Sequence, residues 1–421
     1  MEIKDFIKAE KYCKKVFDGT HDSPKPCAKG YKLLTSKNIL SGELAKTNAY
    51  FISEEDYKSI NRRSKVQKND ILFSMIGSVG NVCLIKDDTI DFAIKNMGVF
   101  SCEDEDEAKY LYYYLQSPLA KKIIASYLNG AVQKFLGLER LRNFPVPSYT
   151  KDKKKIASVL YNIDRKISVN REINRNLEEL AKQIYDYWFV QFDFPNEEGK
   201  PYKSSGGKMT FNTILKRKIP ERWEVKSIND FCTSYRGVSY DKSDLLNGPE
   251  GGVLVLRGNN IDGNTLIYDE NVAYVPPSFV ELEQKIKKHD IIMTMSSGSK
   301  EHVGKCTMFQ SDSEHTYGAF MTKFTPNSNC PFFAYRSMLS DFFKSKIKYI
   351  CGGTGINNFT NQTFDEILFP FPPKDVLKEF EKLLTPIYEK VGKNNDEILK
   401  LTTLRDELLP MLMNGQVGIK E

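Results

Sequence analysis

Residues 30–42 read GYKLLTSKNILSG, and residues 251–263 read GGVLVLRGNNIDG. A second pair of segments repeats in the same order, because residues 68–75 read KNDILFSM and residues 288–295 read KHDIIMTM. In both pairs the offset is about half of the 421-residue chain. Self-similarity at a fixed offset is typical of a duplicated structural unit. The sequence therefore predicts two diverged copies of one module.

Two shorter echoes keep roughly the same offset. The segment FPVP at 144–147 returns as FPFP at 369–372, and IKDF at 3–6 returns as INDF at 228–231. Each copy has the same order of elements: short alternating apolar segments typical of strands, a helical stretch, a proline-punctuated edge, and a long helix.

The long helices give the clearest pattern. Residues 151–190 contain no Gly and no Pro, and their apolar residues recur in steps of three and four, which predicts a rod of roughly 60 Å with one coiled-coil seam. A similar seam begins at Lys374. The first seam holds Ile156, Leu160, Ile163, Ile167, Ile173, Leu177, Leu180, Ile184 and Tyr187, and the second holds Phe380, Leu384, Ile387, Val391, Ile398, Leu401, Leu404 and Leu408.

Asn170 interrupts the first seam and Asn394 the second, each near the middle of its helix. If the copies are related by a pseudo-twofold axis, the helices run antiparallel and the two asparagines meet as a polar layer that fixes register. The alternative is a half-exposed Asn on a loosely packed helix. Pro386 lies within the second helix, so we expect that helix to bend or to start late.

These patterns predict an α+β fold: two mixed α/β domains separated by two long antiparallel helices that form a coiled coil, with a pseudo-twofold internal repeat. The domains are residues 1–150 and 219–373, and the helices are residues 151–190 and 374–421. Residues 191–218 form a linker with turn chemistry, whose aromatic residues suggest that it packs down.

Composition restricts the class of protein. About 40% apolar residues are enough for two or three cores, and no run approaches the ~18 apolar residues of a membrane span. The N-terminus has no apolar signal region, so the cytoplasm is the expected compartment. The eight cysteines are scattered without metal-ligand spacing and are expected to be buried reduced thiols. A formal charge of +6 favours a polyanionic partner only slightly.

The search for catalytic motifs fails. Residues 298–306 resemble a phosphate loop, but the spacing is one residue too long and a cysteine stands where Mg²⁺ needs a hydroxyl. His21 has no nucleophile partner, so a hydrogen-bonding or surface role is expected. The acidic run at 103–107 fits a solvated turn better than a metal site. We therefore expect a protein that recognises a ligand and catalyses nothing, with no metal and no cofactor of its own.

A reader of nucleic acid needs donors and acceptors on loops held by a rigid frame. Any one such residue can equally be an ordinary turn residue, since Asn, Ser and Gly favour turns for local reasons. The candidates in the first copy are Thr20, His21, Ser36, Lys37, Asn38, Ser78, Gln133 and Lys134; those in the second are Arg236, Tyr240, Arg257, Asn259, Asn260, Ser297, Lys300, Asn357 and Asn358.

The loops differ between the copies although the frame segments match. SMIGSVG at 74–80 stands opposite TMSSGSKEHVG at 294–304, and DGTHDSP at 18–24 opposite YRGVSY at 235–240. The same scaffold with different loops indicates two different targets.

The whole chain resembles the specificity (S) subunit of type I restriction-modification systems. The resemblance rests on the ordered set formed by GTHDSP at 19–24 with residues 30–42, the Asp-Ile strand segments, YKSSGGKM at 202–209, IPERW at 219–223 and LRDELLPMLMNG at 404–415. The first copy departs from the pattern, because it lacks the Pro-x-x-Trp entry that Pro220 and Trp223 give the second.

The resemblance implies two target-recognition domains, each reading half of a bipartite sequence in double-stranded DNA. It also implies that the long helices act as a ruler and as the docking platform for two DNA adenine methyltransferase (modification) subunits, joined by restriction/translocase subunits. S-adenosylmethionine and ATP would be bound by those partners, and this chain would be non-catalytic. The rival interpretation is a protein-interaction scaffold with duplicated binding domains; a fused restriction-methylation enzyme is disfavoured by its missing motifs.

Overall fold

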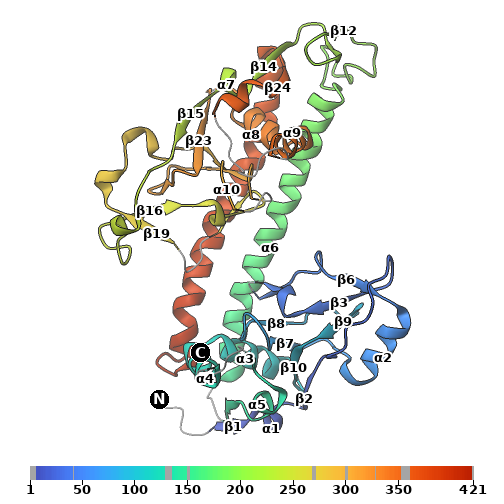
Figure 1. The fold of residues 1–421 in the computed structure, drawn as a ribbon, viewed down its shortest axis with the longest axis vertical. Coiled ribbons are helices and arrows are strands. Elements are labelled where there is room, and N and C mark those ends of the chain that lie inside the picture. The colour runs from blue at the N-terminus through green and yellow to red at the C-terminus, as the bar shows by residue number, and fades with distance from the viewer. Residues whose placement is uncertain are drawn as a thin grey trace. The chain divides into compact units, whose positions relative to one another are not determined.

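The computed structural model describes residues 6–40, 42–128, 135–148, 152–267, 272–298, 302–327, 329–351 and 361–419. The chain forms two compact units (Figure 1). Unit 1 comprises Met1–Val169 with Glu397–Glu421, and unit 2 comprises Asn170–Asp396. The two long helices each contribute a segment to both units, so neither unit is continuous with one half of the sequence.

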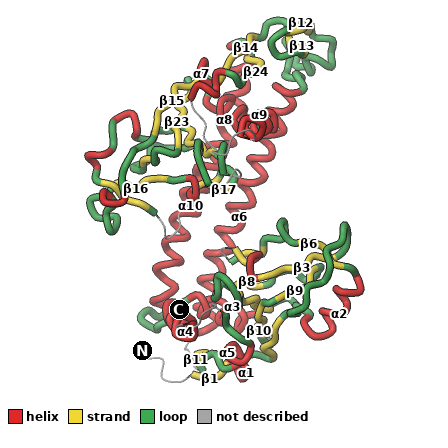
Figure 2. The backbone as a smooth tube through the Cα atoms, viewed as in Figure 1, coloured by secondary structure: helices red, strands yellow, loops and turns green. Residues whose placement is uncertain are grey.

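Unit 1 alternates short strands and helices (Figure 2). Its strands are β1 (Phe6–Lys8), β2 (Lys15–Asp18), β3 (Tyr31–Thr35), β4 (Ile39–Leu40), β5 (Glu43–Leu44), β6 (Tyr50–Ile52), β7 (Asp70–Ser74), β8 (Val82–Leu84), β9 (Phe92–Lys95), β10 (Met97–Ser101) and β11 (Pro145–Pro147). Its helices are α1 (Ala9–Tyr12), the 3₁₀ helix η1 (Ser36–Asn38), α2 (Glu54–Ser64), α3 (Glu105–Gln116), α4 (Pro118–Leu128) and α5 (Leu138–Arg142).

Two sheets form most of the β structure of unit 1. One is antiparallel with the order β2-β10-β7-β8, and the other has the order β6-β3-β9, in which β3 and β9 are parallel. The four-stranded sheet packs against α3, whose Tyr110, Leu111 and Tyr114 are buried. All five residues of β7 are buried, which explains its nearly continuous apolar sequence.

Unit 2 contains the corresponding elements. Its strands are β12 (Met209–Asn212), β13 (Arg217–Pro220), β14 (Glu224–Ser227), β15 (Cys232–Arg236), β16 (Val253–Leu256), β17 (Ile261–Asp262), β18 (Thr265–Leu266), β19 (Ala273–Val275), β20 (Ile291–Thr294), β21 (Cys306–Met308), β22 (Thr316–Tyr317), β23 (Met321–Pro326) and β24 (Leu368–Phe371). Its shorter helices are α7 (Ile228–Phe231), η3 (Lys242–Asp244), η4 (Gly258–Asn260), η5 (Pro277–Phe279), η6 (Leu282–Gln284), α8 (Pro331–Leu339), α9 (Asp341–Cys351) and η7 (Asn361–Asp365).

The strand pairing of unit 2 reproduces that of unit 1 strand by strand. Its larger sheet has the order β15-β23-β20-β21, and its smaller sheet has the order β19-β16-β22 with β16 and β22 parallel. The pair β14-β24 matches β1-β11, and β17-β18 matches β4-β5. Among the described strands, only the β12-β13 hairpin has no counterpart in unit 1. The predicted duplication of one structural unit is confirmed.

The long helices are α6 (Lys153–Tyr185), continued by the π-helix η2 (Asp186–Val190), and α10 (Lys374–Met413). In unit 1, Lys166 Nζ lies 3.4 Å from Glu397 of α10. In unit 2, Asn394 Nδ2 of α10 donates to Asn174 Oδ1 of α6 at 2.7 Å. A second contact in each unit, Asp164 with Arg405 and Glu178 with Tyr388, shows that the partner numbers on α10 fall as those on α6 rise, so the paired segments are antiparallel.

Pro386 does not delay the start of α10. The helix begins at Lys374 and passes through the proline without a break, which corrects the expectation of a late start. Just before the proline, the Thr385 hydroxyl donates to the Glu381 carbonyl at 2.8 Å. Leu384 and Tyr388, on either side of the proline, are both buried, so the helix is held by packing on this face. The loss of the one backbone hydrogen bond that proline cannot donate is therefore tolerated.

Asparagines form a polar layer between the two long helices of unit 2. Both Asn170 and Asn394 are buried, as a register role requires. The partner of Asn394 is Asn174, one turn beyond Asn170, and Asn174 Nδ2 also donates to Asn395 Oδ1 at 2.7 Å. Asn174 and Asn395 give no signal in the sequence, because neither interrupts an apolar seam.

A carboxylate of α6 joins three helices in unit 2. Glu178 Oε2 accepts from Arg336 Nη1 of α8 at 3.0 Å and from the Tyr388 hydroxyl of α10 at 3.4 Å. Arg336 is only 4% exposed. The pKa of Glu178 is raised, because the effect of burial exceeds the opposing effects of the Arg336 guanidinium and the Tyr388 hydroxyl.

Unit 1 contains the corresponding junction with the roles exchanged. Asp164 of α6 accepts from Arg405 Nη1 of α10 at 3.0 Å and from the Tyr113 hydroxyl of α3 at 2.7 Å. The arginine comes from α10 in unit 1 and from α8 in unit 2. In each unit, one carboxylate of α6 therefore links both long helices to a shorter helix, α3 or α8.

The corresponding helices α3 and α8 are capped differently. Asp104 accepts from Glu107 N at 2.8 Å at the start of α3, so the acidic run forms an N-cap and first helical turn. Glu103, Asp104 and Glu105 are exposed, as expected for a solvated segment, but the run is helical and not a turn. At the start of α8, the carboxylate of Glu381 from α10 accepts from the backbone N–H groups of Phe332 and Phe333. Burial raises the pKa of Glu381 to about 7, although these two bonds oppose the shift.

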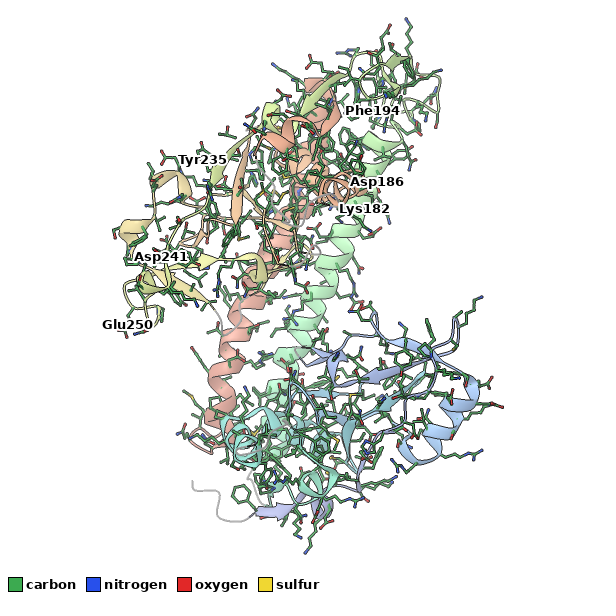
Figure 3. The ribbon with its side chains drawn as sticks, in the orientation of Figure 1. Lys182, Asp186, Phe194, Tyr235, Asp241 and Glu250 are labelled. Atoms are coloured by element: carbon green, nitrogen blue, oxygen red, sulfur yellow. The ribbon has the colours of Figure 1, made fainter. Side chains whose placement is uncertain are left out.

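The linker packs down, as its aromatic residues predict. Phe192 and Phe194 are buried, and Phe194 stacks on Tyr202 with 4.7 Å between ring centroids. Figure 3 labels Phe194 beyond the C-terminal end of α6. Within the last turns of that helix, Lys182 Nζ and Asp186 Oδ2 are 2.9 Å apart. The linker is therefore part of the core of unit 2.

The cysteine expectation holds only in part. The seven cysteines whose side chains are described are free thiols, but Cys27 and Cys102 are half-buried and not fully enclosed. Among the described helices, none combines the length and the apolar character needed to cross a membrane.

We predict that Glu178→Gln lowers the free energy of unfolding by about 3 to 5 kcal/mol, because it leaves the Arg336 guanidinium buried without a counter-charge. Urea unfolding of the full chain measures this loss. Glu179→Gln on the neighbouring exposed position is the control and should change the free energy by less than about 0.5 kcal/mol. Equal effects of the two substitutions would show that the junction does not hold unit 2 together.

Candidate nucleic-acid interface

The turn η1 in unit 1 is held by a buried asparagine. Asn38 Oδ1 accepts from Thr35 N at 2.8 Å, and Asn38 Nδ2 donates to the Ala45 carbonyl at 2.8 Å. Both ends of the amide are therefore engaged, and the side chain is buried. Lys37, the preceding residue, is exposed at the tip of the turn.

The turn η4 in unit 2 repeats this arrangement. Asn260 Oδ1 accepts from Arg257 N at 2.9 Å, and Asn260 Nδ2 donates to the Ile267 carbonyl at 3.2 Å. Asn259 occupies the exposed position of Lys37. Because their amides are buried and satisfied within the turn, Asn38 and Asn260 hold the frame. This corrects their selection from sequence as contacts to nucleic acid.

A close approach of two backbone segments positions the loop after the first strand of each larger sheet. Thr20 N donates to Ile94 O at 3.0 Å, and Val238 N donates to Tyr317 O at 2.7 Å. A Cβ on Gly19 would lie 2.4 Å from Ile94 O, and the corresponding distance from Gly237 to Gly318 O is 2.2 Å. Both positions therefore require glycine, and each closes the frame at the same point.

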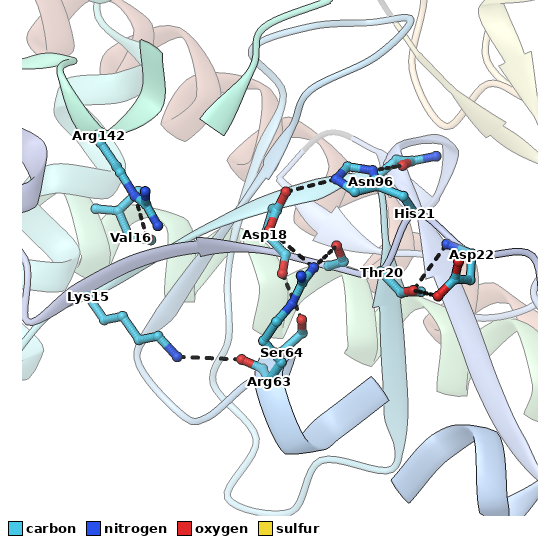
Figure 4. A network of polar contacts seen from close by, with 11 residues as sticks. Lys15, Val16, Asp18, Thr20, His21, Asp22, Arg63, Ser64, Asn96 and Arg142 are labelled. Atoms are coloured by element: carbon cyan, nitrogen blue, oxygen red, sulfur yellow. Dashed lines mark hydrogen bonds and ion pairs between the residues drawn. The ribbon is translucent and has the colours of Figure 1, made fainter. Parts of the chain in front are cut away.

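His21 belongs to a polar network at this point of unit 1 (Figure 4). Its Nε2 lies 3.0 Å from Asp18 Oδ2, and its Nδ1 lies 2.8 Å from Asn96 Oδ1. Asp18 is held in turn by Arg63, whose Nη2 is 3.6 Å from Asp18 Oδ1. His21 is thus a hydrogen-bonding residue, as the sequence predicts, and it fixes the loop with a ring that stays largely accessible.

Three candidate residues of unit 1 meet around Asn96. Thr20 O accepts from Asn96 N at 3.1 Å, Ser36 Oγ donates to Asn96 O at 3.2 Å, and His21 contacts the Asn96 side chain. Asn96 has a positive φ of 52°, a conformation that asparagine tolerates well. Ser78 is exposed in the β7–β8 turn, and Asn81 at the end of that turn donates to Ile39 O at 3.4 Å.

The candidates of unit 2 gather around the turn formed by residues 318–321. Gly318 N donates to Leu256 O at 2.9 Å, which joins this turn to the segment that carries Arg257 and Asn259. The Tyr240 ring lies 3.7 Å from the position that a Cβ on Gly318 would take. Phe320 O accepts from Met295 N at 2.9 Å and from Ser296 N at 3.3 Å, next to Ser297. Arg236 is exposed at the end of β15.

Five candidates from the sequence lie outside the described residues. They are Gln133, Lys134, Lys300, Asn357 and Asn358. Their assignment remains a prediction.

One residue in each cluster was not among those predicted from the sequence. Asn96 and Phe320 lie at matching turns, just before Met97 and Met321 at the start of strands β10 and β23. An alignment of the two copies that is extended through these methionines matches the two turns. Phe320 was also overlooked because the search considered only polar side chains.

The described residues contain no group of three or more His, Cys, Asp or Glu side chains arranged to hold a metal ion. Each cluster instead presents hydroxyl, amide, imidazole and cationic groups from several loops on one rigid frame. Such groups can bind phosphates or the edges of bases.

Comparison with known proteins identifies the family. The model of the type I restriction modification DNA specificity domain matches residues 1–179 and 220–403. The chain belongs to this family. The specificity subunit of the type I restriction enzyme MjaIX from Methanocaldococcus jannaschii is 25% identical over 379 residues, which cover 84% of this chain and 79% of that protein.

Other similarities agree in kind. The EcoKI specificity subunit of Escherichia coli K12 is 30% identical over 210 residues, covering 48% of this chain but only 45% of that protein. The StySPI subunit of Salmonella potsdam is 32% identical over 176 residues, covering 40% of this chain and 38% of the relative. The crystal structure of an S subunit from M. genitalium covers 97% of this chain and 95% of its own, with a TM-score of 0.54 at 15% identity, and supports the fold.

We predict that Asn38→Ala lowers the free energy of unfolding by about 1 to 3 kcal/mol, because it leaves the Thr35 N–H and the Ala45 carbonyl without their buried partner. Thermal or urea unfolding provides the measurement. Lys37→Ala, one residue away and exposed, is the matched control and should be neutral within about 0.5 kcal/mol. A neutral Asn38→Ala would return that residue to the list of ligand contacts.

Proposed function

We propose that this chain is the DNA-recognition subunit of a type I restriction-modification complex, with each unit reading one half of a bipartite target in double-stranded DNA. The observation that carries the proposal is that the two units share their sheets and buried turns but differ in the exposed residues of the loops. The units share their strand order and the turns held by the buried Asn38 and Asn260. At equivalent positions, however, unit 1 has Lys37 where unit 2 has Asn259, and Asn96 where unit 2 has Phe320. A common frame with different exposed groups suits two different DNA sequences.

In this proposal the chain is non-catalytic and binds no cofactor. Two DNA adenine methyltransferase subunits bind S-adenosylmethionine and modify adenine N6, and ATP-dependent restriction/translocase subunits join them in the cytoplasm. The paired helices α6 and α10 form a coiled coil about a pseudo-twofold axis and serve as ruler and docking platform. The asparagine layer formed by Asn170, Asn174 and Asn394 fixes the register of that pair.

The rival, a scaffold whose duplicated domains bind only protein, predicts no selectivity for DNA sequence. We expect the chain, assembled with its modification subunits, to retain a duplex that carries its target more strongly than a duplex that lacks it. Retention of both duplexes should fall steeply as salt is added. A filter-retention titration at several salt concentrations measures both effects. Retention that ignores sequence, or is absent at low salt, would favour the scaffold.

The ruler hypothesis makes a separate prediction. Inserting one heptad into α6 between Ile163 and Leu180, with a matching heptad in α10 between Val391 and Leu404, lengthens the pair by roughly 10 Å, or about three base pairs. The preferred spacer between half-sites should lengthen while the half-sites stay the same. Selection from a random-spacer DNA library measures this, and altered half-site bases with an unchanged spacer would contradict the ruler.

A further inference from the structure

Phe320 is an exposed aromatic side chain on a rigid backbone. It is 69% exposed at the turn of residues 318–321, where Met321 N donates to Gly318 O at 2.8 Å. Its own carbonyl accepts from Met295 N and Ser296 N. Leaving a phenylalanine in water forgoes the free energy that burial of its ring would contribute. Since the backbone is fixed on both sides, the ring is presented to solvent by the frame itself.

The ring lies within the candidate interface of unit 2. The same turn contacts the segments that bear Tyr240, Arg257 and Ser297. The matching turn of unit 1 carries Asn96, whose side chain is bonded to His21. At the same point of the frame, unit 1 therefore presents amide and imidazole groups and unit 2 presents a hydrocarbon surface.

We propose that Phe320 contacts the 5-methyl group of a thymine in the half-site read by unit 2, an inference that rests on the proposed function. Phosphates and sugars offer an uncharged ring no specific partner. Among the groups that base pairs present in the major groove, the thymine methyl is the apolar one, and phenylalanine is among the side chains that contact it. The amide and guanidinium groups nearby are also suited to base edges in that groove. Because the backbone of the turn is already fixed by its hydrogen bonds, binding costs little main-chain entropy.

Replacing thymines one at a time with deoxyuridine removes only the methyl group and provides the test. The probe is a duplex that carries the target sequence mapped by N6-methyladenine sequencing, and the protein is the full chain assembled with its modification subunits. One replacement, in one half-site, should weaken binding roughly five- to twenty-fold. Phe320→Ala should weaken binding of the thymine duplex by a similar factor and should no longer respond to that replacement.

Two further variants sharpen the comparison. Phe320→Leu keeps an apolar side chain and should retain part of the thymine preference. Phe211→Ala removes a comparably exposed aromatic, 59% exposed in the β12–β13 hairpin, and should leave the deoxyuridine profile unchanged. Because Phe320 is exposed, its replacement should not alter the unfolding midpoint.

Three outcomes would overturn the inference. The first is a wild-type complex indifferent to every deoxyuridine. The second is a Phe320→Ala complex that binds more weakly but responds to deoxyuridine as before, which indicates a wedge between base pairs. The third is a variant that fails to assemble with the modification subunits. Failure of the proposed function is distinct, because the unaltered complex would then show no sequence-selective retention before any thymine or side chain is changed.

Discussion

In each unit, one carboxylate of α6 joins both long helices to a shorter helix, α3 or α8, next to the apolar core that the same helices share. Asp164 and Glu178, both on α6, each accept from one arginine and one tyrosine supplied by two other helices. Removing such charges from water is costly, so the arrangement favours one geometry more than it adds net stability. The arginine comes from α10 in one unit and from α8 in the other, and in unit 1 it also contacts Asp406 at 2.7 Å.

The two units share the hydrogen bonds that hold their frame and differ in the exposed residues of their loops. The sheets, the glycine contacts at Gly19 and Gly237, and the buried asparagine turns recur with the same hydrogen bonds. The exposed residues at the ends of this frame do not recur. A rigid frame lets tip residues change without loss of folding, because surface substitutions away from special features cost little. Divergence of the two recognition surfaces therefore requires no change in the cores.

The sequence predicted the architecture better than the interface. Repeats and apolar spacing locate the two modules and both long helices, since these patterns record burial directly. Asn38 and Asn260 misled the interface prediction, because an asparagine that holds a turn looks the same in sequence as one that reads a base. Asn174 was missed because its partner, Asn394, comes from a distant part of the chain. Phe320 was missed because its exposure depends on a turn that is held by hydrogen bonds to distant parts of the chain, at Leu256 and at Met295.

The central claim is that one chain reads two different half-sites through one duplicated frame. Mapping N6-methyladenine across a host genome, with the chain and its partners present and then with this chain alone deleted, tests it most directly. The account predicts one bipartite motif with unequal halves and a fixed spacer, lost on deletion. Methylation that persists after deletion, or a single uninterrupted motif, would contradict it.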